Sequence, residues 1–475
     1  MSFVFYDTET TGTETSFDQI LQFAAIKTDD ELNEIDRLEL RCRLLPHVVP
    51  APGAMRVTGV SVSQLHDKAN CSHYDMVRKI RAKLVEWSPS IILGYNSLDF
   101  DEHLLRQAFY KTLHPPYLTN TNGNGRGDVL RMVRAASMFA PDAIIIPADA
   151  KGKPVFKLDR VAPINGFDHS SAHDALADVR ATIHLSRLLM NKAPSVWSTG
   201  MRFSQKAAVV DYLTSERISC WCEFYFGSGY TYLVTPIGTN PDNGAEIYVF
   251  DLQIDPQSLI DLNDTQLAAR LGRSPKPVRR LKTNLSPMLV SVDEAPATRA
   301  SVLSLDELES RADYLENDEP FRNRLISALE AGRDPKEASP YYEKQIYDGF
   351  WPKTDDFLME SFHAVPWEKR LTIADSFQDP RLKAIALDLI HAERPDLLHK
   401  SICDERDHAR ARRVLGLDGD VPWLTIPKAI EEVEEMLADC EEAHRPHLQD
   451  HCNHLRSWLE SAKKILAAST KAKSA

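Results

Sequence analysis

Two carboxylates near the start of the chain stand two residues apart in the string YDTETTG. They are Asp7 and Glu9, and the apolar run FVFY before them predicts a buried strand. Side chains at positions i and i+2 of a strand point to the same face, so the two carboxylates lie side by side. A cation between them relieves their repulsion, and oxygen ligands without Cys or His favour Mg²⁺ or Mn²⁺. The alternative is an exposed strand end with ordinary surface acids.

Two more acids and a histidine follow later in the sequence. Asp101 comes shortly after the apolar run IILGYN, at the start of the next expected helix, close to where ligands gather at the strand ends of α/β sheets. Asp178 lies on an expected helix in the string SSAHDALADVRATI, and His173 stands five residues before it. Each has an ordinary structural alternative, because acids are common at helix starts and polar residues are common on surface helices.

The elements that must position these side chains form a mixed α/β domain, an open sheet covered by helices. The pattern predicts that Phe3–Thr8 is a central strand with Ile20–Thr28 and Leu38–Leu45 as its antiparallel neighbours, which a polar turn at 29–33 joins. The expected strands are Phe3–Thr8, Ile20–Thr28, Leu38–Leu45 and Ile91–Tyr95, and the expected helices are Tyr74–Trp87, Phe100–Leu113, Val129–Phe139 and Ala175–Asn191.

The rest of the chain changes character twice. The segment Asn191–Ser204 is expected to be a linker, and aromatic and β-branched alternation between 224 and 252 predicts β-hairpins divided by the turn GTNPDNG. After about residue 300 the pattern is helical. The predicted domains are therefore 1–192, 202–350 and 351–475.

Composition limits the class of protein. With 475 residues, 43% hydrophobic content and a net charge of −13, the chain is expected to fold into several soluble domains. Seven cysteines without a CxxC pair argue against a disulfide framework or a thiolate zinc site, and a reducing cytoplasm is expected. No apolar run of about 18 residues predicts a membrane span, and the first residues do not resemble a signal peptide. The acidic balance is only weak evidence against nucleic acid, because a basic groove suffices.

The combined pattern is far more specific than its parts. D-x-E on a first strand, an Asp after a later strand and H-x(4)-D on a late helix resemble the histidine subgroup of the DEDD 3′→5′ exonuclease superfamily. Further strings resemble bacterial exonuclease I, namely QFAAIKTD, the PGA…TG segment at 52–59, RQAFY with PPY, and YDGFW. The resemblance implies an α/β, ribonuclease H-like exonuclease core with a mixed sheet, then an SH3-like β-rich domain and a helical C-terminal domain.

The resemblance also implies an activity, the processive 3′→5′ hydrolysis of single-stranded DNA to 5′-mononucleotides in DNA repair and recombination. Two Mg²⁺ ions, for which Mn²⁺ would substitute, would be bound about 3.5–4 Å apart. By resemblance Asp7 bridges both ions, Glu9 and Asp178 complete the first site, and Asp101 supports the second. His173 is the expected general base, because imidazole titrates near neutrality.

Strand-binding residues are expected from the same resemblance, since single-strand binders combine cations with aromatic faces. Lys157 stands where the family has arginine. Lysine keeps the positive charge but cannot bind a phosphate at two points as a guanidinium does. Two of the expected contacts lie in or just after the most basic stretch, Arg270–Lys282, for which a solvated loop is the alternative. The expected substrate contacts are Glu9, Arg106, Tyr117, Arg134, Lys157, Arg279 and Asn284.

Partners and alternatives remain open at this point. Family members bind the acidic C-terminal tail of single-stranded-DNA-binding protein, yet Ala140 stands where an arginine is expected. No heptad seam is visible in the C-terminal helices, so a monomer without a membrane partner is expected. Two rival readings are an RNA-directed exonuclease of the same superfamily and a catalytically inactive DNA-binding clamp or scaffold.

Overall fold

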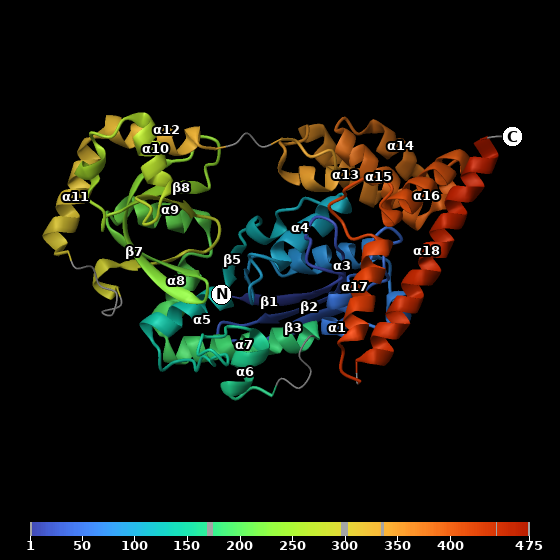
Figure 1. The fold of residues 1–475 in the computed structure, drawn as a ribbon, viewed down its shortest axis with the longest axis horizontal. Helices are drawn as coiled ribbons and strands as arrows, with labels where there is room; N and C mark the ends of the chain where they lie inside the picture. Colours follow the sequence, from blue (N-terminus) through green and yellow to red (C-terminus); the bar gives the residue numbers. More distant parts are fainter. Residues whose placement is uncertain (1, 169–173, 296–302, 334–336, 443, 474–475) are drawn as a thin grey trace.

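The computed structural model describes residues 2–168, 174–295, 303–333, 337–442 and 444–473. It contains two five-stranded sheets, each with its own helices, and a C-terminal group of helices (Figure 1). The first sheet, which carries the acids, lies in the central part of the view. His173 lies outside the described residues.

The first sheet is mixed. Its strand order is β3–β2–β1–β4–β5, with β1 antiparallel to β2 and parallel to β4. Because β1, β4 and β5 are parallel, their carboxyl ends meet at one edge of the sheet. The bounds are β1 Phe3–Thr10, β2 Ile20–Thr28, β3 Glu34–Arg41, β4 Ile91–Gly94 and β5 Gly125–Asp128.

Alternation along β1 explains why both faces of this sheet are covered. Phe3 and Phe5 pack with α5 and α7, whereas Val4 and Tyr6 pack with α3 and α4. The helices of this domain are α1 Pro52–Thr58, α2 Val62–Leu65, α3 His73–Glu86, α4 Asp101–Lys111, α5 Val129–Phe139, α6 Leu158–Ile164 and α7 Ala175–Lys192.

The predicted strands and helices of the first domain are largely confirmed. The third strand is displaced, because the turn at 29–33 is closed by Asp29 and Asn33 and pairing resumes at once at Glu34. The short strand β5, with the sequence GRGD, was not predicted, since it offers no apolar alternation.

The linker predicted at Asn191–Ser204 is wrong. Helix α7 continues to Lys192, and a further helix, α8, spans Pro194–Arg202. Pro194 fits the first turn of α8, where a missing N–H costs nothing. Trp197 is buried edge-on against Phe3 of β1, with ring centroids 5.6 Å apart, so the segment is part of the core.

The second sheet is antiparallel, in the order β10–β6–β7–β8–β9, and confirms the predicted β-rich region. Phe226 and Gly227 form the two-residue turn between β6 and β7, both with positive φ, as this turn requires. Helix α9 covers one face, and α10, α11 and α12 cover the other. The bounds are α9 Lys206–Ser215, β6 Ser219–Tyr225, β7 Ser228–Thr239, β8 Glu246–Asp251, α10 Asp264–Gly272, β9 Val278–Lys282, β10 Met288–Ser291, α11 Leu305–Asn317 and α12 Glu319–Ala331.

The C-terminal region is helical, as predicted, and packs on the first domain through two apolar clusters. One cluster includes Tyr74 of α3 and Tyr110 of α4, and the other includes Val49, which precedes α1. Helix α18 runs along the right-hand edge of the molecule (Figure 1). The bounds are α13 Lys353–Ala364, α14 Trp367–Ser376, α15 Pro380–Glu393, α16 Lys400–Leu415, α17 Ile426–Ala438 and α18 Arg445–Lys473.

Candidate active site

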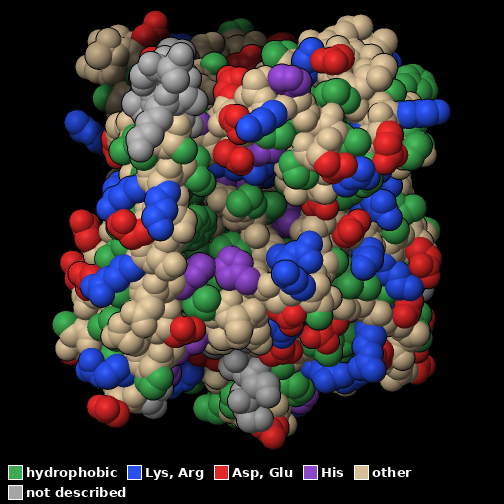
Figure 2. All heavy atoms as spheres, turned by 90° about the vertical axis from the view of Figure 1, so that its right-hand side faces the viewer, with side chains coloured by type: hydrophobic (Ala, Val, Ile, Leu, Met, Phe, Trp, Pro, Cys, Tyr) green, Lys and Arg blue, Asp and Glu red, His purple; other side chains and the backbone are tan. Residues whose placement is uncertain are grey.

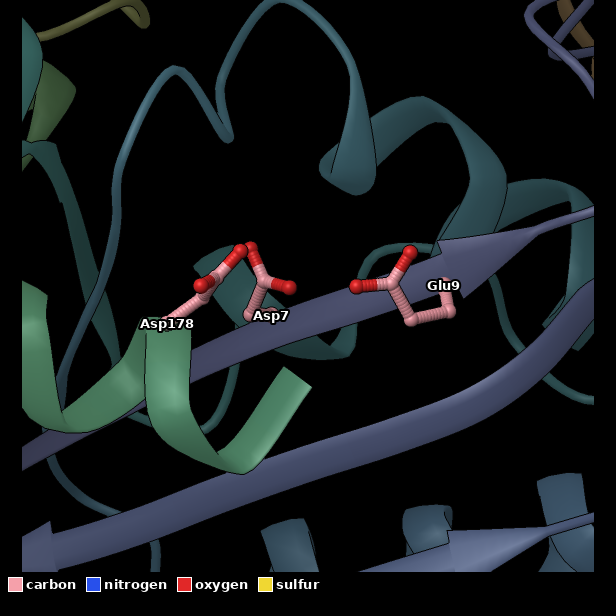
Figure 3. A group of neighbouring side chains, drawn as sticks. All are labelled: Asp7, Glu9 and Asp178. Carbon is pink, nitrogen blue, oxygen red and sulfur yellow. The ribbon is translucent and has the colours of Figure 1, made fainter. Parts of the chain in front are cut away.

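Three carboxylates converge above the first sheet. Asp7, Glu9 and Asp178 each offer an oxygen, and these oxygens lie within 4.8 Å of one another (Figure 3). Glu9 is buried, and the other two are partly exposed, so the cluster is open on one side. Among the described residues this is the single group of three or more acids, histidines or cysteines with such spacing. The structure thus brings three of the predicted site residues together.

Strand β1 and helix α7 set this geometry. Asp7 and Glu9 share the face of β1 that carries Phe3 and Phe5, which is the face covered by α7. Asp178 lies in the first turn of α7. Asp174 caps that helix by accepting a hydrogen bond from the backbone N–H of Ala177, which fixes where the first turn begins.

The electrostatics of the cluster favour a bound cation. Loss of surrounding water and then the charges of Asp101, Asp178 and Glu9 raise the pKa of Asp7 well above its usual range. Loss of water, followed by the charge of Asp178, raises the pKa of Glu9 to about 8. A divalent cation among these oxygens would stabilise the ionised forms and reverse both shifts.

Asp101 stands beside the cluster but is held differently. It is buried at the first residue of α4, and its Oδ1 accepts a hydrogen bond of 2.5 Å from the hydroxyl of Thr8. Burial raises the pKa of Asp101 to about 7 although that hydrogen bond lowers it. It is not among the three acids that share one ligand site, yet its charge contributes to the raised pKa values of Asp7 and Glu9.

Sequence reasoning missed a polar group that borders the acids. Arg41 of β3 forms an ion pair of 2.8 Å with Asp174, and Gln22 of β2 donates to the same carboxylate. The charge of Asp174 raises the pKa of both Asp7 and Glu9, whereas Arg41 lowers that of Glu9. The signal was available, because Asp174 follows His173 directly and stands where a helix cap is expected.

The donor set fits divalent ions that prefer oxygen. Three carboxylates gathered on one rigid strand and one helix are the ligands Mg²⁺ and Mn²⁺ favour, and no cysteine or histidine among the described residues joins the group. Arg41 pairs with Asp174 and lowers the pKa of Glu9, but one cation does not balance the charge of all the neighbouring acids. The residues present therefore fit a metal site.

Arg106 of α4 and Tyr117, two of the predicted contacts to the DNA strand, already interact with other side chains of the protein. Arg106 pairs with Glu102 at 2.8 Å, with only 11% of its side chain exposed, and its guanidinium lies over the ring of Tyr117. Glu102 is buried and also accepts hydrogen bonds from Arg126 and Thr119. Arg126 was missed by sequence reasoning, because a lone arginine in GRGD gives no signal of a buried partner.

The remaining predicted contacts lie on separate elements. Arg134 of α5 stacks near the rings of Phe156 and Phe224, and Lys157 is exposed at the start of α6. Arg279 of β9 lies over the ring of Tyr232, near Asp251. Asn284 accepts a hydrogen bond of 2.9 Å from Arg126 at its backbone oxygen, which joins the second sheet's domain to the first. Their contact with a strand stays a prediction.

Two family models match the chain. The model described as "Exonuclease" matches residues 4–186, and the model described as "Exonuclease I SH3-like domain" matches residues 222–330. The four acids fall within the first range, and the second sheet falls within the second apart from the first three residues of β6. This chain belongs to the exonuclease I family.

Known exonuclease I proteins match this chain over most of its length. Exodeoxyribonuclease I of Escherichia coli is 29% identical over 376 residues, which is 76% of this chain and 78% of the relative. A solved exonuclease I from Methylocaldum szegediense is 25% identical, with a TM-score of 0.82 over 98% of this chain and 99% of that one. E. coli exonuclease I in complex with a dT13 oligonucleotide shares the fold, with a TM-score of 0.81 at 23% identity over 98% of this chain and 99% of that one. The predicted fold class is thereby confirmed.

Within the described part of the chain, no helix combines the length and the apolar character that a membrane crossing demands.

Proposed function

We propose that this protein is an exodeoxyribonuclease that removes nucleotides from the 3′ end of single-stranded DNA. The observation that carries the proposal is the convergence of Asp7, Glu9 and Asp178, with Asp101 beside them, in a chain of the exonuclease I family. The proposed products are 5′-mononucleotides, released processively. The relatives are bacterial enzymes, and we place this protein in the cytoplasm, in DNA repair and recombination.

The carboxylates are proposed to hold two Mg²⁺ ions, with Mn²⁺ as a substitute. A divalent metal fits the donor set, and one relative has been solved as a zinc ion-bound complex with single-stranded DNA. Metal ions bound there would lower the pKa of a water molecule and stabilise charge on the leaving 3′ oxygen. Asp7, Glu9 and Asp178 would hold one ion, and Asp101, fixed by Thr8, would support the other with Asp7.

His173 is proposed as the group that takes the proton from the attacking water. The residue that follows it in the sequence, Asp174, lies close enough to raise the pKa values of Asp7 and Glu9. An imidazole with a pKa near neutrality suits the role.

The strand is proposed to contact Arg106, Tyr117, Arg134 and Lys157 of the first domain, with Arg279 and Asn284 of the SH3-like domain. Cations and aromatic faces on both domains would bind the sugar–phosphate backbone and stack on bases, without reading their sequence. Glu9 is also assigned a contact to the terminal nucleotide. The proposed domains are an exonuclease domain at 1–192, an SH3-like DNA-clamping domain at 202–350 and a helical C-terminal domain at 351–475.

A protein partner is proposed as well. One relative has been solved as a complex described as SSB/Exonuclease I. By the family resemblance, the C-terminal tail of single-stranded-DNA-binding protein is the proposed ligand. Ala140, at the end of α5, packs against the core and supplies no charge there. Other cations must therefore bind the acidic tail. We propose that the protein acts as a monomer.

Substrate preference tests the proposal. Oligomers of one sequence, labelled at the 5′ end, would be supplied as single-stranded DNA, duplex DNA and RNA, with Mg²⁺ or with EDTA. We expect Mg²⁺-dependent shortening from the 3′ end of the single-stranded DNA alone. Equal or faster loss of RNA would move the protein to the RNA-directed branch of the superfamily.

A further inference from the structure

Two histidines from distant parts of the sequence meet on the surface that carries α18. His66 follows α2 in the first domain and His454 lies on α18, and their Nε2 atoms are 3.3 Å apart. The ring centroids are 4.9 Å apart and the rings are tilted by 54°. Figure 2 shows this side of the molecule, with histidine side chains gathered near its middle.

This separation is the one that two imidazoles adopt on a single metal ion. Zinc–nitrogen bonds of about 2.0–2.1 Å at a tetrahedral angle place the two nitrogens about 3.3 Å apart. The rings are tilted by 54° rather than stacked face to face, and their Nε2 atoms are the atoms in contact. We propose that His66 and His454 bind a transition-metal ion of the zinc class, with Asp450 as the third protein ligand.

Asp450 is suited to complete the site. It stands four residues before His454 on α18, so the two side chains lie on the same helix face, and its charge acts on His454. Asp450 is exposed and can turn toward the pair without breaking a buried contact. Two imidazoles, one carboxylate and a water would make a four-coordinate site of ordinary composition.

Both imidazoles are in the form that binds metal. Burial, followed by the neighbouring His66, lowers the pKa of His454, and burial lowers the pKa of His66. Both rings are therefore neutral at neutral pH, and each has one nitrogen lone pair. Without a metal, the two Nε2 atoms are in hydrogen-bond contact, which requires one ring to carry its proton there.

The surroundings hold the two ligands in place. His451 and His447 of α18 contact the backbone oxygens of Pro50 and Met55, which lie immediately before and within α1. Leu448 and Leu455 are fully buried beneath them. A metal at His66 and His454 would thus link the C-terminal helix to the first domain, at a place already set by packing. This site does not depend on the nuclease activity.

Zinc binding to the full-length, tag-free protein tests the proposal. Competition with a chromophoric chelator would give the zinc stoichiometry and affinity, and the same titration of Asp7→Asn would identify zinc bound by the acid cluster. We expect one Zn²⁺ per chain at the histidine pair, lost in His66→Gln and in His454→Gln, weakened about tenfold in Asp450→Asn, and kept in the control His408→Gln on α16. Circular dichroism would check that each variant is folded.

Hydrogen exchange of α18 supplies a readout that is independent of stoichiometry. Zinc should slow exchange in the turns around His454 in the wild-type protein and leave His66→Gln unchanged. Absence of zinc binding to the wild-type protein, or full zinc binding by His66→Gln or His454→Gln, would overturn the proposal and leave a hydrogen-bonded histidine pair.

Discussion

Thr8 of β1 donates its hydroxyl hydrogen to the carboxylate of Asp101 at the start of α4, across 2.5 Å. Thr8 stands between Asp7 and Glu9 in the sequence, and its side chain points to the opposite face of the strand. The same strand therefore carries two acids toward α7 and fixes a third from its other face. The hydroxyl of Thr8 is therefore one of the contacts that orient the Asp101 carboxylate beside the cluster.

Removing that hydroxyl group should weaken catalysis more than strand binding. In Thr8→Val the carboxylate of Asp101 loses its side-chain donor and keeps its backbone donors, so its pKa rises further and its orientation is less restricted. We expect kcat on single-stranded DNA to fall about tenfold, since a lost hydrogen bond to a buried charged group costs about 1–3 kcal/mol. Thr8→Ser keeps the hydroxyl and should retain most of the activity. Equal kcat in the valine variant and the wild-type protein would contradict this role.

Metal-free protein should lose stability as the pH rises. Glu9 has an ordinary pKa of 4.5 when the chain is unfolded and a pKa of about 8 when it is folded. The folded state holds a proton that the unfolded state lacks between these values, so the free energy of unfolding falls from about pH 4.5 to about pH 8. Below that window both states are protonated and the contribution is fully present.

Urea unfolding in EDTA across this pH window measures the effect. Glu9→Gln cannot ionise, so we expect its stability relative to the wild-type protein to increase by on the order of 2–4 kcal/mol between pH 5 and pH 8. The control Asp142→Asn alters an exposed carboxylate of the same domain and should follow the wild-type curve. Mg²⁺ or Mn²⁺ should stabilise the wild-type protein at pH 8 and have a smaller effect on Glu9→Gln. Parallel curves for Glu9→Gln and the wild-type protein would count against the raised pKa.

Arg126 should matter for stability rather than for strand contact. It is 5% exposed and joins the buried carboxylate of Glu102 to the backbone oxygen of Asn284. Breaking a buried ion pair costs about 3–5 kcal/mol, so Arg126→Met should lower the melting temperature by about 6 °C or more. Arg131→Met removes a comparable bridge to Leu285, but its acidic partner Asp99 is half-exposed, so its loss should be smaller. Thermal melts of both variants decide the order.

Lys157 offers a test of the strand path. It is exposed at the start of α6, so replacing it changes few internal contacts. One lost phosphate contact should reduce the slope of log affinity against log salt by about 0.7 for single-stranded DNA. We expect this in Lys157→Ala, and tighter binding in Lys157→Arg because the guanidinium binds phosphate at two points. Lys68→Ala, an exposed lysine of the same domain, is the control, and an unchanged slope in Lys157→Ala would remove this residue from the strand path.

Much of the first domain could be predicted from the sequence because β1, β2 and β4 are continuous apolar runs, and Asp7 and Glu9 follow the strand period. Local pattern does not reveal long-range contacts. The segment around Trp197 has the composition of a linker, and only the complementary surface beside Phe3 makes it a helix of the core. Likewise, nothing in the string GRGD indicates that Arg126 reaches Glu102.

The candidate site, too, was only partly predictable from the sequence. The strand period placed Asp7 and Glu9 side by side, the family resemblance added Asp178, and the structure brings the three together. The hydrogen bond from Thr8 to Asp101 could not be predicted, because it depends on how closely α4 approaches β1. Arg106 is an expected strand contact whose charge is already paired with Glu102, so its role in binding remains a prediction.

Single-turnover digestion of 5′-labelled single-stranded DNA by the wild-type protein, Asp7→Asn and the control Asp142→Asn tests the central claim most directly. Strand binding by each protein would be measured in parallel without metal. We predict Mg²⁺-dependent loss from the 3′ end by the wild-type protein and Asp142→Asn, and a rate at least about a hundredfold lower for Asp7→Asn with binding retained. Equal rates for Asp7→Asn and the wild-type protein, or strand binding without any cleavage by the wild-type protein, would contradict the account and indicate a DNA-binding clamp.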